Sequence, residues 1–154
     1  MNAALLPEIS RSLSRSWQLL AGQALPFATD KPCPSLAEAK FYSLMIDGDP
    51  QAGHAAVLHI STPGLREITA TMFDMAADRL DERQLDDVGR ELCNILGACC
   101  VEALRHDGES LTIGLPQSLS AHGLVDLLSR GSVLVQFVAV NIEGSPTVRV
   151  LRFQ

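Results

Sequence analysis

An acid and an amide lie three residues apart in a helix-prone segment near the middle of the chain. The segment reads DDVGRELCNILGACC over residues 86–100 and contains Glu91 and Asn94. Neighbours on a helix surface are three or four residues apart, so Asp87, Glu91 and Asn94 would stack along one stripe. Asparagine is a poor residue for the middle of an exposed helix, because its amide competes with the backbone for hydrogen bonds. The stripe is either an ordinary solvated face or a reactive pair presented to something outside the protein.

The same segment carries an apolar stripe, which predicts the side that packs on the core. Its members recur three or four residues apart in a helix expected from about 81 to 105: Leu85, Val88, Leu92, Ile95 or Leu96, and Cys99. The acid and the amide belong to a different stripe of this helix.

The first third of the chain predicts a helix and a hairpin. An amphipathic helix is expected over 7–21, opened by Pro7, and a proline-rich connection over 25–36 follows it. Two β-prone runs, 38–49 and 53–62, flank the turn-rich sequence DGDPQAG. They predict an antiparallel hairpin.

A further helix is expected over 61–80, with Ser61 or Thr62 as its N-cap. Its predicted inward stripe is Leu65, Ile68, Met72, Met75 and Ala76. After the central helix, the sequence predicts a strand, a weaker helix and a second hairpin, over 110–116, 118–131, and 132–142 with 147–154.

Strands that come in hairpins, with helices grouped between them, indicate an α+β domain with an antiparallel sheet. The chain of 154 residues fits one domain, 1–154, with the N-terminal helix and connection over 1–35 and the core over 36–154.

The composition excludes some classes of partner and site. The net charge is −6 and the arginines are scattered, which argues against nucleic acid as a partner. No apolar run is long enough to span a membrane and no secretion signal is recognisable, so we expect a cytoplasmic protein. The four cysteines lack metal-site spacing and are expected to be small, partly buried residues, which predicts no metal site: Cys33, Cys93, Cys99 and Cys100.

The run ELCNILG, Glu91 to Gly97, resembles the E-x-x-N signature of the bacterial CheC/CheX/FliY chemotaxis phosphatases, and of the CheX-like members in particular. The run FYSLMIDGDPQAGHAAVLHIST resembles the opening hairpin of that family, and TATMFDMA resembles the helix after it. Asp87 stands four residues before Glu91, and Pro116 lies 22 positions after Asn94, near the offset expected for the proline of the family. The resemblance covers roughly residues 36–153 and implies a CheX-like fold.

The resemblance also implies an activity. Such phosphatases hydrolyse the aspartyl phosphate of a CheY-type response-regulator receiver domain in two-component signalling. By this resemblance Asn94 positions the attacking water, and Glu91 engages a lysine of the receiver. Asp87 would extend the surface that contacts the partner. The chain needs no cofactor of its own, because the Mg²⁺ belongs to the receiver.

Two departures from the CheC-like pattern indicate which branch of the family this chain resembles. CheC-like motifs place Asp or Ser three residues before the glutamate, where this chain has Val88, and they occur on two helices, whereas one is found here. Both features point to the single-site CheX-like branch. The residues after Gly97 are Ala98-Cys99-Cys100, where another small or polar residue is expected.

CheX-like relatives pair as dimers through their sheets, and the apolar run VLVQFVAV (133–140) is a candidate edge for such a homodimer. Two other functions stay open. One is a CheX-like scaffold that binds a signalling or flagellar partner without hydrolysis. The other is a thiol- or metal-linked regulatory domain that uses Cys93, Cys99 and Cys100.

Overall fold

The computed structural model describes residues 3–34, 38–49, 52–101, 104–105, 111–140 and 146–153. Four α-helices are present among them: α1 (Leu6–Ala21), α2 (Thr62–Phe73), α3 (Glu82–Val101) and α4 (Ala121–Arg130). The strands are β1 (Phe27–Ala28), β2 (Ala39–Asp49), β3 (Ala52–Ser61), β4 (Thr112–Ile113), β5 (Gln117–Leu119), β6 (Gly131–Ala139) and β7 (Thr147–Phe153). Short 3₁₀ turns lie at Ala3–Leu5 and Ala77–Arg79.

All the strands belong to one antiparallel sheet. Its order is β1-β6-β7-β3-β2-β4, with β5 also paired to β2. The two predicted hairpins are confirmed: β2 pairs with β3, with Tyr42 opposite Leu58, and β6 pairs with β7, with Phe137 opposite Val148. The predicted α+β class with an antiparallel sheet is therefore confirmed.

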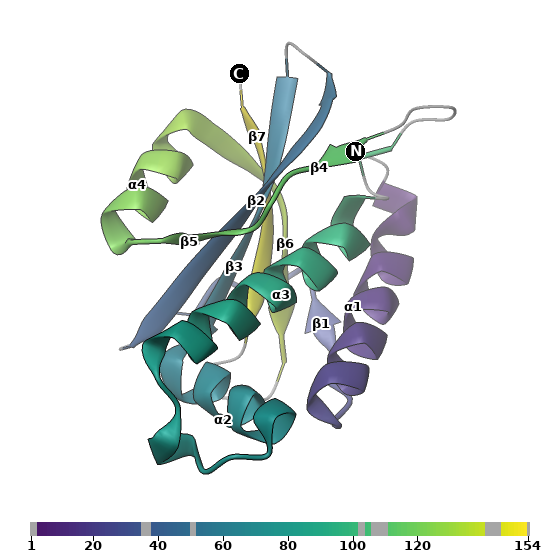
Figure 1. The fold of residues 1–154 in the computed structure, drawn as a ribbon. Coiled ribbons are helices and arrows are strands. Elements are labelled where there is room, and N and C mark those ends of the chain that lie inside the picture. The colour runs from purple at the N-terminus through teal and green to yellow at the C-terminus, as the bar shows by residue number, and fades with distance from the viewer. Residues whose placement is uncertain are drawn as a thin grey trace.

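The helices cover the two faces of the sheet unequally. The main core joins residues of α1, α2 and α3 to sheet residues such as Leu58 and Val150. A smaller cluster joins Leu127 of α4 to Val57 and Leu151, which are the next residues along the same strands. Because successive strand residues point to opposite faces, α4 packs on the face opposite to α3. In Figure 1, α3 crosses the sheet with α1 beside it and α2 at its lower end.

The C-terminal part of the second helix differs from its prediction. Ser61 is the N-cap of α2, and its Oγ accepts a hydrogen bond from Gly64 N at 3.0 Å. The helix ends at Phe73, because Asp74 takes a left-handed conformation with φ 50°. The expected inward stripe is wrong beyond Ile68: Met72 is exposed in the last turn of α2, and Met75 and Ala76 are exposed beyond its end.

Two short strands were not predicted. The proline-rich connection contains β1, which pairs with the end of β6. Residues 117–119, expected partly as the start of a helix, form β5 instead, and α4 begins at Ala121. Within the strand expected over 110–116, the described residues form β4 at Thr112–Ile113, and α3 is described as far as Val101. Residues 102–103, in the expected continuation of this helix, and residue 110 lie outside the described residues.

The expected dimer edge is partly covered by the chain itself. Phe27 and Ala28 of β1 pair with Ala139 and Val138, and the side-chain amide of Gln136 donates to the Lys31 carbonyl at 2.8 Å. Pairing through the remainder of β6 stays a prediction.

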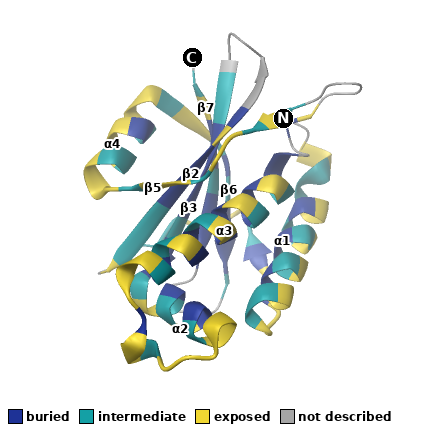
Figure 2. Cartoon of the chain, in the orientation of Figure 1, coloured by how far each residue is buried: buried dark blue, intermediate teal, exposed yellow. Residues whose placement is uncertain are grey.

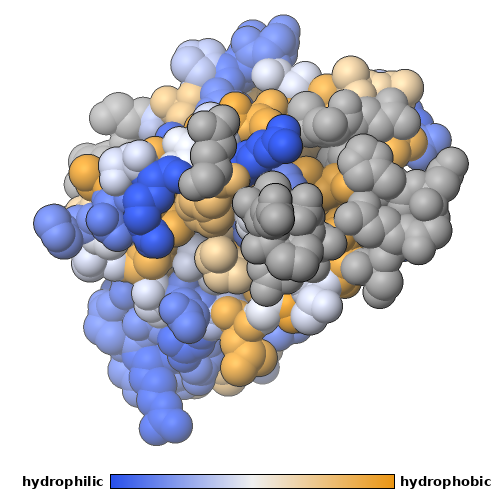
Figure 3. Space-filling view, turned by 90° about the horizontal axis from the view of Figure 1, so that it is seen from above, coloured by the Kyte–Doolittle hydropathy of each residue, from blue (hydrophilic) through white to orange (hydrophobic). Residues whose placement is uncertain are grey.

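The end of the molecule at the top of Figure 1 is shown in Figure 3, where the coloured hydrophilic and hydrophobic residues are interspersed. Among the described residues, none of the helices is long and apolar enough to cross a membrane.

Candidate functional site

Helix α3 is fixed at its N-terminus by a reciprocal capping interaction. The Asp81 carboxylate accepts from Gln84 N at 2.8 Å, and the Gln84 side chain accepts from Asp81 N at 3.0 Å. Two backbone donors that the helix leaves unpaired are thereby satisfied.

Two glycines let α3 lie close to the sheet. A Cβ atom at Gly89 would overlap the ring of Tyr42, which is completely buried. A Cβ at Gly97 would lie 2.8 Å from Leu44 Cδ2 and 3.3 Å from Ala56 Cβ. Any larger residue at either position would push the helix outward or move its neighbours. The close packing of α3 on β2 and β3 thus explains why the ELCNILG run ends in a glycine, Gly97.

The predicted core stripe of α3 is buried, and the second stripe is exposed. Leu85, Val88, Leu92 and Leu96 are buried, whereas Ile95 and Cys99 are half-buried. Asp87, Glu91, Asn94 and Ala98 are all exposed. We call this exposed set the α3 ridge. Figure 2 shows the outer side of α3 as a line of exposed residues that crosses in front of the sheet.

The acid and the amide of the ridge have no partner within the described part of the chain. No hydrogen bond or ion pair of the Glu91 carboxylate or of the Asn94 amide is found among these residues. Asp87 differs, because it forms an ion pair with Arg90 at 2.6 Å. Arg90 also donates to Ser118 Oγ at 3.1 Å, which ties the ridge to β5. The structure therefore places Glu91 and Asn94 on the same ridge without partners among the described residues, whereas the Asp87 carboxylate is already paired with Arg90.

A network of paired groups lies on the side of α3 that faces β2. Asp86 Oδ1 accepts from the Tyr42 hydroxyl at 2.8 Å and from Lys40 Nζ at 3.1 Å, and Lys40 also pairs with Glu82 at 2.6 Å. Burial raises the pKa of Tyr42 above its usual range, and the hydrogen bond to Asp86 raises it further. Burial lowers the pKa of Lys40, but its hydrogen bonds to Glu82 and Asp86 outweigh that effect, and the pKa is raised. Tyr42 and Lys40 therefore keep their protons to a higher pH than the free side chains do.

The fold has clear relatives among solved structures. A CheC-like superfamily protein from Shewanella sp. PV-4 is similar over 100% of both chains, with a TM-score of 0.68 and 16% identity. The chemotaxis protein CheX from Vibrio vulnificus is similar over 97% of both chains, with a TM-score of 0.65 and 18% identity. CheX in the CheX–CheY–BeF₃–Mg²⁺ complex from Borrelia burgdorferi is similar over 97% of both chains, with a TM-score of 0.68 and 12% identity.

The chain has the CheX-like fold of the CheC/CheX/FliY family. No family model and no curated protein matches its sequence. The structural likeness spans almost the whole chain, including the N-terminal helix. The resemblance read from the sequence is thus confirmed at the level of the fold.

Within this CheX-like fold, the proline of the resemblance lies near the ridge. Pro116 is half-buried and directly precedes β5, whose Ser118 contacts Arg90. The Lys40–Tyr42–Asp86 network was missed by the sequence analysis. A weak signal for it exists, because a glycine, Gly89, interrupts a strong helix three residues after Asp86, where a neighbour must come close.

The cysteines are divided between core and surface. Cys93 and Cys100 are buried, and burial raises the pKa of the Cys93 thiol to about 12 and that of Cys100 higher still. Cys33 and Cys99 are half-buried, and all four cysteines are free thiols. Within the described residues, no group of His, Cys, Asp and Glu is arranged to hold a metal ion.

Proposed function

We propose that this chain is a protein phosphatase that hydrolyses the aspartyl phosphate of a CheY-type response-regulator receiver domain in chemotaxis or a related signalling pathway. The observation that carries the proposal is that Glu91 and Asn94 project, unpartnered within the described chain, from one exposed ridge. A neighbour of the same fold, CheX from Borrelia burgdorferi, is found in complex with CheY, BeF₃ and Mg²⁺.

Asn94 positions water in this proposal. An aspartyl phosphate is an activated acyl phosphate, and its transfer passes through a loose transition state that needs little help from a base. The water oxygen attacks phosphorus as the bond to the aspartyl oxygen breaks, and the products are inorganic phosphate and a free carboxylate. The amide of Asn94 offers one acceptor and two donors, which can hold the water in line. Its exposure makes it accessible to a docked partner.

Glu91 acts as a positioning residue. Its free carboxylate would pair with a lysine of the receiver and dock α3 against the phosphorylated pocket. An exposed ion pair is worth at most about 1 kcal/mol, so this contribution is expected mainly in affinity. Asp87, already paired with Arg90, would contribute to the contact surface next to it. The Mg²⁺ that the reaction requires would be held by the receiver.

The test is the loss of phosphate from a panel of phosphorylated receiver domains incubated with the purified chain. We expect the wild type to accelerate dephosphorylation of at least one receiver. Asn94→Ala should lower kcat about 100-fold, the effect of removing one preorganised polar group from an active site. Glu91→Ala should raise KM about fivefold, from the loss of about 1 kcal/mol.

Matched controls exist on other helices. Gln18→Ala removes an exposed amide from α1, and Glu67→Ala removes an exposed carboxylate from α2. Both should keep wild-type kinetics. If Asn94→Ala is as active as the wild type, the mechanism is wrong. If the wild type binds a receiver and accelerates no dephosphorylation, the chain is a CheX-like scaffold rather than an enzyme.

A further inference from the structure

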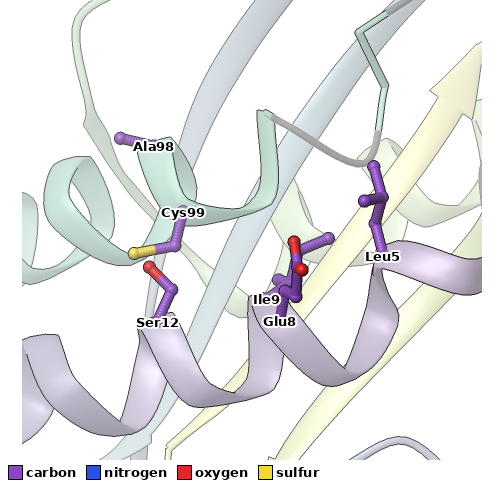
Figure 4. A pocket seen from close by; sticks show the side chains of 6 residues that line it. All are labelled: Leu5, Glu8, Ile9, Ser12, Ala98 and Cys99. Atoms are coloured by element: carbon purple, nitrogen blue, oxygen red, sulfur yellow. The ribbon is translucent and has the colours of Figure 1, made fainter.

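A hollow lies between α1 and α3 at the C-terminal end of the ridge. It measures about 470 Å³ and is lined by residues of α3, α1 and the turn before α1: Ala98, Cys99, Glu8, Ile9, Ser12 and Leu5. Figure 4 shows the Cys99 sulfur and the Ser12 hydroxyl directed toward one another between the two helices, with Glu8 nearer the N-terminus of α1 and Leu5 just before that helix. Most of the lining is apolar, and Glu8 is the charged residue in it.

This hollow is continuous with the ridge. Ala98 belongs to both, and it follows Asn94 by four residues, which is about 6 Å along a helix axis. Successive residues of a helix point in directions about 100° apart, so the three residues after the motif, Ala98-Cys99-Cys100, have three different environments. Ala98 is exposed, Cys99 faces α1, where its thiol lies 3.4 Å from Ser16 Oγ, and Cys100 is buried in the core.

A partner that contacts Asn94 must also cover the surface of α3 on either side of this residue. A specific interface buries about 800 Å² on each partner, which is far more than two side chains provide. Toward the N-terminus of α3 this surface carries the exposed Asp87–Arg90 ion pair, which is polar. Toward the C-terminus it opens into the apolar hollow, which has room for a large side chain.

We propose that the hollow between α1 and α3 is a docking subsite that accepts a large apolar side chain of the phosphorylated receiver domain. This inference rests on the proposed function. Glu8 lines the subsite, and Glu91 is exposed two helical turns before Ala98 on the ridge, so the matching face of the receiver carries basic residues around its apolar anchor. A buried apolar anchor in a pocket is the kind of contact that dominates interface affinity. The subsite therefore selects which receiver binds, without taking part in hydrolysis.

The test fills the hollow from the α1 side, which leaves α3 unchanged. Ser12→Leu places a larger side chain in the hollow, and no hydrogen bond of the Ser12 side chain is found among the described residues. For a receiver that the wild type dephosphorylates, Ser12→Leu should raise KM about tenfold, as expected when an interface anchor is lost, and leave kcat within about twofold. Ser14→Leu is the matched control, because Ser14 is on the same helix, is also half-buried and lines a different hollow with Arg11 and Pro26. It should keep the wild-type KM.

A second experiment fills the hollow without changing its sequence. In a Cys33→Ser background, N-ethylmaleimide should modify Cys99, since Cys93 and Cys100 are buried and their pKa values are raised. One adduct, confirmed by mass spectrometry, should reproduce the rise in KM seen with Ser12→Leu. The double variant Cys33→Ser/Cys99→Ser, treated in the same way, should be unaffected.

The results separate the two proposals. If the wild type is active and both filled forms keep its KM, or lose kcat at unchanged KM, the subsite is refuted while the phosphatase stands. If the wild type neither binds nor dephosphorylates any receiver, both proposals fail. A rise in KM that is confined to the filled forms supports the subsite, and circular dichroism and thermal unfolding will confirm that each variant is folded.

Discussion

The two sides of α3 use similar residues for opposite purposes. On the sheet side, Asp86 accepts from Tyr42 and Lys40, and the neighbouring Glu82 completes an ion pair with Lys40. On the outer side, Glu91 and Asn94 find no partner among the described residues. Unpaired polar groups on an exposed ridge are solvated and cost little, whereas groups at a packed interface must be paired. The acid of the ridge is therefore available to a second molecule, and the acid beside the sheet is not.

The largest expected effect is on the packed side. Gly89→Ala should lower the free energy of unfolding by about 3 kcal/mol, because the new methyl group overlaps the buried, hydrogen-bonded Tyr42 ring. Without this overlap, alanine would stabilise the helix by up to about 1 kcal/mol. A loss of stability would therefore indicate the overlap, and a gain would indicate helix propensity alone. Urea denaturation measures it. Gly123→Ala in α4 is the control, because its nearest neighbours are Ser120 Oγ at 3.3 Å and Leu119 Cδ2 at 3.6 Å, and it should be close to neutral. A stable Gly89→Ala protein would show that α3 is not held tightly on β2.

A smaller effect concerns the pH dependence of the packed side. The folded protein holds the Tyr42 proton above the usual pKa of 10.0, because of burial and the bond to Asp86. The unfolded chain releases that proton near pH 10, so it binds fewer protons than the folded state, and stability falls as pH rises above this value. The raised pKa of Lys40 acts in the same direction.

Tyr42→Phe should cost about 1 kcal/mol at neutral pH and should flatten this alkaline decline. Tyr42 is the one tyrosine in the sequence, so tyrosinate absorbance reports its ionisation directly. In the wild type this absorbance should rise together with unfolding. A rise near pH 10 in a protein that is still folded would contradict the Tyr42–Asp86 hydrogen bond.

The smallest effect is expected on the ridge. Glu91→Ala and Asn94→Ala should each change the free energy of unfolding by no more than about 0.5 kcal/mol, the usual range for exposed positions without partners. The same denaturation experiment measures both. A loss above about 1 kcal/mol for either variant would mean that the residue supports the fold and would remove the contrast between the two sides of α3.

The parts of this protein that depend on local periodicity could be predicted from the order of its residues. The stripe of Leu85, Val88 and Leu92 predicted α3 and its buried side, and the same spacing placed Glu91 and Asn94 on another stripe. The two hairpins were also predictable, because short β-prone runs flank turn-forming residues. The element order and the α+β class followed from these local signals.

The surroundings of the ridge depend on contacts between distant segments and could not be predicted from local patterns. The pairing of Asp86 with Tyr42 and Lys40 joins residues more than 40 positions apart, and no local period encodes it. The end of α2 at Asp74 cut off an apolar spacing that continued to Ala76, so Met75 lies beyond the helix and is exposed. The hollow between α1 and α3 likewise exists because two distant helices pack on one sheet. Local periodicity fixes which side of a helix is apolar, but what that helix meets is set by contacts between segments far apart in the chain.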